Sequence, residues 1–433
     1  MATYDNYKDS GVQWLGLIPS HWEVKKIRAF FSEVGEINTT LRVQNQLQFK
    51  YGTIVSKPDC SIDASVLNTI SKYTVVQPGD IIINGLNLNY DLISFRVGKV
   101  NELGVITSAY IAMRPKEGIL PKFYEYMLKA MDAKKVFHGF GTGIRATLSF
   151  KELKHKLLPF IPIYEQEAIV AYLDKETGKI DRAIEAQQKM IDALNERKQI
   201  IITRAVTRGL NPDAPLRDSG IDWLGQIPKH WEIKKLKTVA VIKGRIGFRG
   251  YTNADLVVQG EGAITLSPSN IVNGKMKYEK CSYLSWRKYI ESPEIMVKNG
   301  DILFVKTGSS YGKTAYVDNL PMEATINPQF SLVKPNEIIS QFLNFAISSQ
   351  YFKTQVEKGV IGSTIPTISQ SAIGCMFILT PSHEEQEKIV DYIQTQFLDL
   401  DNLLSNCERM ISLLQERKQI IINEVVTGKK KVI

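Results

Sequence analysis

Internal repetition is the feature of this 433-residue sequence that most limits what it can fold into. The stretch DSGVQWLGLIPSHWEVKKI begins at Asp9 and recurs as DSGIDWLGQIPKHWEIKKL from Asp218, with 13 of 19 positions identical. Two further matches lie 220 residues apart: EQEAIVAYL recurs as EQEKIVDYI, and ERKQIII occurs unchanged in both halves. The same motifs in the same order predict two tandem copies of one unit.

The segments between these motifs have diverged. Residues 40–75 and 245–295 do not align convincingly, whereas the flanking motifs keep most of their residues. Drift of surface loops is one explanation, but loops seldom run to about a hundred residues. A constant frame with two different inserts indicates two recognition domains on one scaffold.

Long amphipathic helices are predicted to start at Glu165 and at Glu385. Apolar residues recur there at alternating spacings of three and four over about five heptads, which is the pattern of a coiled coil. Ser382 forms a capping box with Glu385, and Gly209 and Gly428 are the natural stops. The seam residues predicted to form the helix-pair interface are Leu173, Ile180, Ile184, Ile191, Leu194, Ile201, Ile393, Leu400, Leu404, Ile411, Leu414 and Ile421.

Each seam also keeps one lysine, Lys198 or Lys418, inside ERKQIII. A lysine in a coiled-coil seam lowers stability but can fix register or orientation. Two seams of matched length in one chain most simply pack on each other, although pairing with a second chain is the alternative. A helix from Glu165 to Val206 would be roughly 60 Å long. If the pair is antiparallel, the two domains lie at opposite ends of a rod.

The domains are predicted to be of the α+β class. Short β-type runs such as KYTVVQPGDIIING, GVITSAYIAMRP and SPEIMVKNGDILFVKT are broken by Gly, Asn and Pro, and helical stretches follow near Pro121 and Ile338. The expected boundaries are residues 1–163 for the first recognition domain, 164–212 for the central helix, 213–381 for the second recognition domain and 382–433 for the C-terminal helix.

The positive charge lies in the two inserts. Residues 20–163 hold 19 Lys and Arg against 12 Asp and Glu, and residues 228–381 hold 18 against 11, so each block has a net charge of +7. Residues 164–212 balance at 8 against 8, and residues 382–428 hold 4 against 9. Two basic domains on a chain without a basic scaffold indicate nucleic acid as the ligand, although lysines solvated without any ligand are the alternative.

Three stretches resemble catalytic motifs only loosely. TGSSYGKT leaves three residues between Gly308 and Gly312 where a phosphate-binding loop needs four. GTGIRA, from Gly141, fits a dinucleotide pattern but has no following βαβ unit. NPQF, from Asn327, is close to the NPPF of adenine methyltransferases, but no glycine-rich loop for a methyl donor accompanies it. No catalytic residues are therefore predicted.

The cysteines and histidines predict a reduced, cytoplasmic protein without a bound metal or cofactor. Four cysteines (Cys60, Cys281, Cys375 and Cys407) are scattered, and the five histidines lack the spacing of metal ligands. No apolar run reaches the roughly 18 residues of a membrane span. The N-terminal residues also lack the pattern of a secretory signal.

The repeated motifs WLGxIPxHWE and EQExIVxYL, the GDI turn and the GSTIPTIS stretch (Gly362 to Ser369) together resemble the DNA-specificity subunit of type I restriction-modification systems. The resemblance covers nearly the whole chain, with one departure: the first half has GIRATLS in place of STIPTIS. It implies that each domain reads one half of a split, asymmetric site in double-stranded DNA and that the helices set the spacing. It further implies two methyltransferase subunits and two ATP-dependent restriction subunits as partners, and a non-catalytic role for this chain.

Basic and polar residues beside glycines are the predicted DNA contacts, because glycine lets the backbone approach DNA closely. Lys and Arg would contact phosphates, and a few side chains would read base edges. The predicted contacts are Lys243, Arg245, Arg249, Lys306, Ser309, Ser310 and Lys313 in the second domain, and Asn87, Asn89, Arg96, Arg145 and Thr147 in the first.

Two other functions remain open on the sequence alone. The chain could be a coiled-coil scaffold whose basic domains bind protein or RNA, or a self-sufficient modification enzyme. Selection of bound duplexes from random DNA distinguishes a scaffold from a DNA-recognition protein, because only the latter yields a split consensus sequence. Incubation with a labelled methyl donor distinguishes the enzyme.

Overall fold

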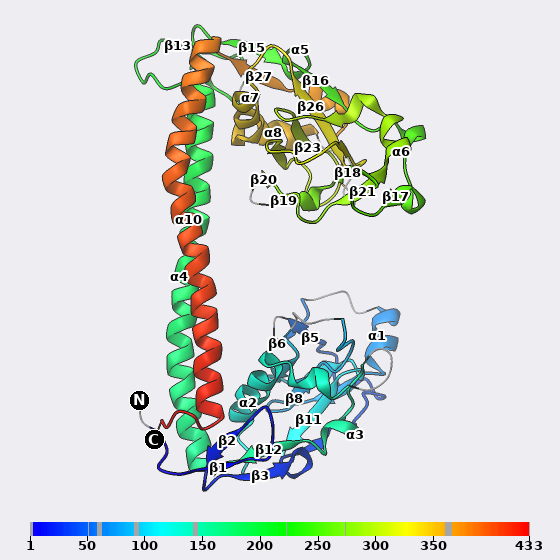
Figure 1. Ribbon diagram of the computed structural model, residues 1–433, viewed down its shortest axis with the longest axis vertical. Coiled ribbons are helices and arrows are strands. Elements are labelled where there is room, and N and C mark those ends of the chain that lie inside the picture. Colours follow the sequence, from blue (N-terminus) through cyan, green and yellow to red (C-terminus); the bar gives the residue numbers. More distant parts are fainter. Residues whose placement is uncertain are drawn as a thin grey trace. The chain divides into compact units, whose positions relative to one another are not determined.

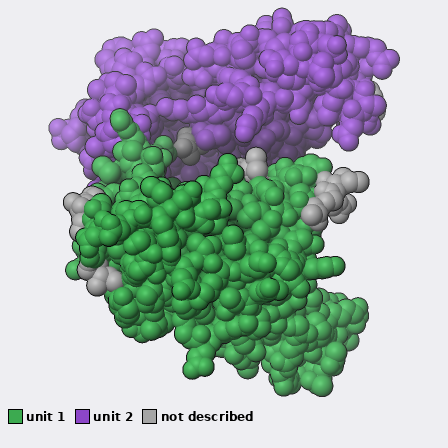
Figure 2. Space-filling view, turned by 60° about the horizontal axis from the view of Figure 1, so that its bottom comes forward, with its two compact units in different colours: residues 1–188, 408–433 green, residues 189–407 purple. Residues whose placement is uncertain are grey.

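The computed structural model describes residues 3–50, 52–58, 63–90, 95–141, 146–221, 223–272, 274–359 and 366–432. The chain divides into two compact units, which Figure 2 shows in green and purple: unit 1 comprises residues 1–188 and 408–433, and unit 2 comprises residues 189–407. Two long helices, α4 (Ile163–Arg208) and α10 (His383–Val426), each contribute one part to either unit. Each unit therefore contains one globular domain and one pair of helical segments (Figure 1).

The globular domain of unit 1 is built on a four-stranded antiparallel sheet with the strand order β4-β11-β8-β9. Helix α2 (Pro121–Ala133), the helix predicted after Pro121, lies against β9 and buries Phe123, Met127 and Met131 in the core. Short antiparallel pairs β1-β2, β3-β12, β5-β6 and β7-β10 complete the domain. The strands and remaining helices are β1 (Tyr7–Asp9), β2 (Leu17–Pro19), β3 (Glu23–Lys26), β4 (Phe31–Glu33), β5 (Leu47–Lys50), β6 (Thr53–Ser56), α1 (Ala64–Ile70), β7 (Thr74–Val76), β8 (Ile81–Ile83), β9 (Val97–Lys99), β10 (Gly104–Ile106), β11 (Ile111–Pro115), α3 (Phe150–Leu153) and β12 (Leu157–Phe160).

The globular domain of unit 2 holds a six-stranded sheet, β16-β26-β23-β24-β20-β19, and a five-stranded sheet, β17-β21-β18-β25-β22. The single helix predicted near Ile338 is broken in two, because Ser349 has extended backbone (φ −73°, ψ 159°). The strands are β13 (Leu216–Asp218), β14 (Gln226–Pro228), β15 (Glu232–Lys235), β16 (Ala240–Lys243), β17 (Leu256–Val257), β18 (Gly262–Leu266), β19 (Ile271–Val272), β20 (Lys275–Met276), β21 (Ser282–Ser285), β22 (Met296–Val297), β23 (Ile302–Val305), β24 (Thr314–Tyr316), β25 (Ala324–Ile326), β26 (Phe330–Pro335) and β27 (Phe377–Thr380). The helices are α5 (Leu236–Val239), α6 (Trp286–Ile290), α7 (Ser340–Ser348), α8 (Gln350–Gly359) and α9 (Gln370–Cys375).

Two of the repeated motifs, WLGxIPxHWE and EQExIVxYL, contact each other in both units. In unit 1 the buried Trp22 donates from Nε1 to Glu165 Oε2 at 3.0 Å, and in unit 2 Trp231 makes the same bond to Glu385 Oε2 at 3.0 Å. These tryptophans belong to WLGxIPxHWE, and these glutamates begin EQExIVxYL. In both units these motifs join the start of a long helix to the segment that follows the first hairpin of the domain.

The glutamine of EQE makes a second shared contact. Gln166 Oε1 accepts the backbone N–H of Leu120 at 2.9 Å, just before α2, and Gln386 Oε1 accepts the N–H of Ile339 at 2.9 Å, just before α7. An N–H at a helix start has no partner within its own helix, so a side-chain acceptor stabilises it. These bonds attach each domain helix to the first turn of a long helix.

The long helices pair in antiparallel fashion within each unit, as predicted. In unit 1 Leu173, early in α4, shares a core with Ile422 and Val425, late in α10. In unit 2 the relation is reversed, because Leu194, late in α4, packs with Leu400, early in α10. The cores of both domains extend onto these seams, so the helix pair is part of each unit's hydrophobic core.

The seam lysines form reciprocal ion pairs across the helix pair. In unit 2 Lys198 pairs with Asp401, and in unit 1 Lys418 Nζ lies 2.6 Å from Asp181 Oδ1. The two lysines occupy matching positions of the repeat, and so do the two aspartates. A one-residue slip of either helix would separate both pairs, which supports the role in register predicted for the lysines.

Among the described residues, no helix is long and apolar enough to span a membrane.

Candidate nucleic-acid interface

Three of the predicted lysines gather at one end of the six-stranded sheet of unit 2. Lys243 is the last residue of β16, Lys306 follows β23, and Lys313 directly precedes β24. Backbone N–H of Lys306 donates to Gln329 O at 2.8 Å, which brings the residue before β26 to the same end. Lys243 and Lys313 are exposed, whereas Lys306 is half-buried and burial lowers its pKa. Cations at the ends of adjacent strands form a surface suited to phosphate.

The described part of the GSTIPTIS stretch pins the loop after β23. Backbone N–H of Gly308 donates to Pro366 O at 3.1 Å, and that of Ile368 donates to Lys306 O at 2.9 Å. The predicted contacts Ser309 and Ser310 lie in the turn that follows, between β23 and β24. The described part of this stretch therefore acts through its backbone, by holding the loop that carries the candidate side chains.

A groove of about 610 Å³ opens beside this loop. Lys306, Gln329, Gln370 and Ser371 contribute to its lining. A side-chain Cβ at Gly244 would lie 1.9 Å from Gln370 Nε2, so only glycine lets Gln370 take this position. Glutamine amides can donate to and accept from the edge of adenine, and a lysine can bind phosphate or guanine. The groove therefore combines groups for base reading with a positive charge.

Sequence reasoning missed both glutamines. Gln370 directly follows GSTIPTIS, and Gln329 belongs to NPQF, whose resemblance to a methyltransferase motif gives no indication of DNA contact. Their position next to glycine-rich loops was the available signal. Their convergence was not predictable, because it depends on the order β16-β26-β23 in the sheet.

The two predicted arginines of unit 2 are held by protein groups. Arg245 is only 8% exposed, and its guanidinium donates to Thr325 Oγ1 at 3.0 Å and to Ile326 O at 3.1 Å. The prediction that Arg245 contacts DNA is corrected to a structural role, since its donors hold β25. Arg249 Nη1 lies 3.2 Å from Glu294 Oε2, so a carboxylate balances its charge.

In unit 1 the predicted asparagines lie in the loop after β8. Asn87 and Asn89 are exposed, and Asn87 has a left-handed backbone (φ 53°). The loop is pinned as in unit 2, because Leu148 N–H donates to Gly85 O at 2.9 Å. Thr147 is exposed on this pinning segment. Gly85 thus takes the position of Lys306, and Asn87 and Asn89 lie in the loop that corresponds to the turn after Lys306 in unit 2.

The two predicted arginines of unit 1 do not lie on the described surface of this loop. Arg96 is fully buried, and its Nη1 donates to Asn84 O at 3.0 Å and to Leu86 O at 2.8 Å. It braces the loop from inside, so the prediction that Arg96 contacts DNA is corrected to a supporting role. Arg145 lies outside the described residues.

The three loose catalytic motifs gain no support from the described residues. TGSSYGKT forms the β23-β24 hairpin, so no helix N-terminus follows it to bind phosphate. In NPQF, Asn327 Oδ1 accepts the N–H of Gln329 at 3.0 Å and shapes the turn before β26. GTGIRA falls largely outside the described residues. No group of three potential metal ligands occurs in the described part of the chain.

Comparison with known proteins gives one consistent family. Residues 228–408 match the model of the type I restriction modification DNA specificity domain. The specificity subunit of type I restriction enzyme MjaVIII from Methanocaldococcus jannaschii is 24% identical over 423 residues, covering 96% of this chain and 94% of the relative. The EcoKI specificity subunit from Escherichia coli is 22% identical over 212 residues, covering 47% of this chain and 44% of the relative.

A solved structure shares the fold. A chain from a study of complex assembly and conformational transition of a type I R-M system superposes with a TM-score of 0.62, covering 94% of this chain and 98% of that chain. The sequence identity is 14%, so the likeness concerns the fold.

Proposed function

This chain belongs to the family of type I restriction-modification DNA specificity subunits, and we propose that each of its globular domains reads one half of a split, asymmetric site in double-stranded DNA. The pinned loop at the end of a sheet carries this proposal, since it occurs in both units with different side chains. Unit 1 offers the amides of Asn87 and Asn89, whereas unit 2 offers Lys306, Gln329 and Gln370. Two loops that are held in the same way but carry different side chains fit two half-sites of different sequence.

The helix pair is proposed to set the spacing of the half-sites. α4 has 46 residues in one continuous helix. A straight helix of this length is about 70 Å long. One turn of duplex DNA is about 34–36 Å long. A spacer of at least about one turn of duplex between the half-sites is therefore expected.

The catalytic steps are assigned to partners. Two methyltransferase subunits would methylate adenine, and two ATP-dependent restriction subunits would cleave DNA, while this chain directs both without a catalytic site or cofactor of its own. The complex would work in the cytoplasm, where its DNA substrate lies. The coiled-coil scaffold with protein- or RNA-binding domains is the alternative function.

Duplicated exposed side chains support two copies of a partner on the helix pair. Met190 and Ile200 in unit 2 are exposed, and so are Met410 and Ile420, their counterparts at the same repeat positions in unit 1. Single exposed apolar side chains are common on protein surfaces, but the same two recur here at equivalent positions of both halves, which favours a protein contact shared by both halves. We assign these residues to the two methyltransferase subunits, one copy for each unit.

Selection of bound DNA from random duplexes, with the chain and its methyltransferase partner present, tests DNA recognition. We expect a consensus of two short halves separated by a fixed spacer. Lys306→Ala should weaken binding and lower the slope of log affinity against log salt by about one if Lys306 contacts a phosphate. Lys388→Ala, on the helix α10, is the matched control and should leave both quantities unchanged. Duplexes bound without any consensus would instead favour the scaffold.

Substitution of the duplicated isoleucines tests the partner assignment. Ile200→Asp or Ile420→Asp should reduce the methyltransferase content of the complex from two copies to one, and the double variant should bind none. Leu398→Asp changes another exposed apolar residue of the helix pair, without an apolar counterpart at Gly178, and should keep both copies. Native mass spectrometry measures the copy number directly. Two copies on the double variant would refute the assignment.

A further inference from the structure

Beside the Glu165 and Glu385 contacts and the shared cores, the domain helix α2 or α7 is itself attached to a long helix at two places. The first place is the same in both units: the glutamine of EQE, Gln166 or Gln386, accepts the N–H just before α2 or α7. The second place lies 11 residues further along each long helix, at Thr177 and at Phe397. Eleven helical residues span about 16 Å. Two contacts this far apart restrain the angle between the domain helix and the long helix more strongly than either contact alone.

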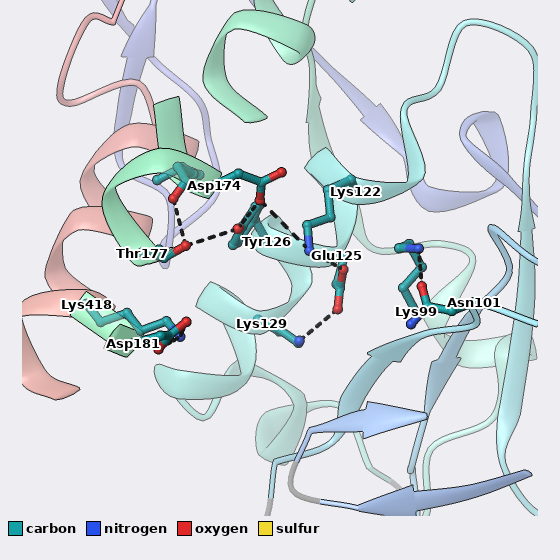
Figure 3. A network of polar contacts seen from close by, with 11 residues as sticks. Lys99, Asn101, Lys122, Glu125, Tyr126, Lys129, Asp174, Thr177, Asp181 and Lys418 are labelled. Atoms are coloured by element: carbon teal, nitrogen blue, oxygen red, sulfur yellow. Dashed lines mark hydrogen bonds and ion pairs between the residues drawn. The ribbon is translucent and has the colours of Figure 1, made fainter. Parts of the chain in front are cut away.

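In unit 1 the second place is a polar contact (Figure 3). Tyr126 on α2 is buried, and its hydroxyl donates to Asp174 Oδ1 at 2.5 Å and lies 3.4 Å from Thr177 Oγ1. Asp174 and Thr177 both belong to α4. Burial, and the bond to Asp174, raise the pKa of Tyr126, so its hydroxyl keeps the proton that it donates.

Charged neighbours hold the α2 face of this contact in place (Figure 3). Lys122 Nζ lies 5.1 Å from the centre of the Tyr126 ring and 4.0 Å from Asp174 Oδ1. Glu125 is buried beside it, 3.5 Å from Lys122 and 2.7 Å from Lys129. Burial alone would raise the pKa of Glu125, but the two lysines hold it below its usual value. The contact is thus a charged and hydrogen-bonded network.

In unit 2 the second place is aromatic. The ring of Phe345, on α7, lies 6.0 Å from the ring of Phe397, on α10, in edge-to-face geometry. Lys198 Nζ lies 4.4 Å from the centre of the Phe397 ring. Tyr126 and Phe345 occupy equivalent positions, since each lies six residues after the residue whose N–H binds the glutamine. The first attachment is therefore constant and the second differs in chemistry.

We infer that Tyr126 and Phe345 are positioning residues, each of which sets the angle of its domain on the helix pair and thereby the length of DNA spacer that the protein accepts. This inference rests on the proposed function. The proposed role requires no contact of Tyr126 or Phe345 with DNA. A domain that loses this second contact is held less firmly in its angle on the helix pair, so its reading loop can reach half-sites that are nearer or farther along the duplex.

The experiment measures spacer tolerance with Tyr126→Phe in the full chain, bound to its methyltransferase partner. The DNA library carries the two half-sites that the unaltered protein selects, separated by spacers of varied length, and sequencing gives the enrichment of each length. Loss of one hydrogen bond to a charged group should raise binding to spacers one base pair too long or too short, relative to the best length, by about three- to tenfold. The half-site sequences should stay the same.

Tyr124→Phe is the matched control. Tyr124 is also on α2 and also buried, but its hydroxyl donates to Pro159 O at 3.0 Å, inside the domain. The two variants lose the same group at neighbouring positions, so a general loss of stability would affect both. In unit 2, Phe345→Leu should widen the spacer range, whereas Phe352→Leu, which changes a ring that packs on Phe304 in the domain core, should not.

The outcomes separate this inference from the proposed function. If the unaltered protein selects no split site, the proposed function fails. If it does, and Tyr126→Phe keeps the original spacer profile or shifts it no more than Tyr124→Phe, the positioning role is refuted. Should Tyr126→Phe not fold, as judged by thermal melting, Asp174→Ala removes the same acceptor from a half-exposed site and must then widen the range.

Discussion

The two glutamates that begin EQExIVxYL offer a stability comparison inside one molecule. Glu165 is 1% exposed and accepts from Tyr4 Oη at 2.5 Å, Trp22 Nε1 at 3.0 Å and His21 Nε2 at 3.0 Å. This carboxylate therefore ties the N-terminal segment, the first hairpin and α4 together. Its removal should destabilise unit 1 more than the matching change destabilises unit 2.

In unit 2 the same site is more open. The Glu385 side chain is 25% exposed and accepts from Trp231 Nε1 at 3.0 Å and His230 Nε2 at 2.9 Å. Within the described part of unit 2, no tyrosine takes the place of Tyr4. Both histidines are about half exposed, so water can replace the carboxylate as their partner.

The magnitudes follow from the number of buried donors left without an acceptor. Glu165→Ala leaves two buried donors, Tyr4 and Trp22, without an acceptor, whereas Glu385→Ala leaves only Trp231 without one. Each buried donor without a partner costs about 1–3 kcal/mol, which gives about 2–6 kcal/mol for unit 1 and about 1–3 kcal/mol for unit 2. The loss in unit 1 should therefore be about twice the loss in unit 2.

Hydrogen exchange read peptide by peptide measures the opening free energy of each unit separately. Glu165→Ala should accelerate exchange in β1–β3 and the start of α4, and Glu385→Ala should accelerate it in β13–β15 and the start of α10 to a smaller extent. An equal loss of opening free energy in the two units, or a larger loss in unit 2, would show that the number of buried donors without an acceptor does not determine the destabilisation.

Three further outcomes are expected. Leu194→Glu with Leu414→Glu places a charge in both seams, so the helix pair should open and the complex with the methyltransferase should be lost; unaltered gel filtration and partner binding would contradict this. Lys198→Asp should lower the melting temperature, and the added change Asp401→Lys should restore part of it, whereas an equal loss in the double variant would argue against the ion pair. Glu125→Gln should lower stability at pH 7, and the difference should shrink steadily as the pH is lowered through the folded pKa of this carboxyl, because a lowered pKa stabilises the fold only while the group is ionised; a difference that does not change with pH would show that packing is the cause.

The repeat and the helix periodicity predicted much of the architecture. The 3-4 spacing predicted that the two long helices pair and placed Lys198 and Lys418 in the seam, because helix periodicity alone decides which residues share a face; it does not decide whether the helices run parallel or antiparallel. The acidic partners Asp401 and Asp181 were not predicted, since the register between two helices depends on both. The contact between WLGxIPxHWE and EQExIVxYL was also not predictable, because it joins residues about 140 positions apart.

The candidate site was predicted less well than the fold. Lys243, Lys306 and Lys313 meet at one end of a sheet, but their charge and their neighbouring glycines did not distinguish them from Arg245, which is buried. Burial of an arginine depends on the backbone carbonyls that surround it, and a local sequence window does not contain those carbonyls. Gln370 was missed for the same reason, because Gly244 makes room for it from a distant strand.

The C-terminal end of α10 has a topological consequence. Gly428 packs against Pro19 and Trp22, and its carbonyl oxygen accepts from Tyr7 Oη at 3.1 Å, so both chain ends meet in unit 1 (Figure 1). In unit 2 Gly209 packs against Trp231 in the same way, but there the chain runs on without a break. The junction between the end of a long helix and a first hairpin thus occurs in both units, as a continuous chain after Gly209 in unit 2 and as side-chain contacts around Gly428 in unit 1. Joining Tyr4 to Val432 by a short linker and cutting between Gly209 and β13 would exchange the two kinds of junction and leave both hydrophobic cores uncut.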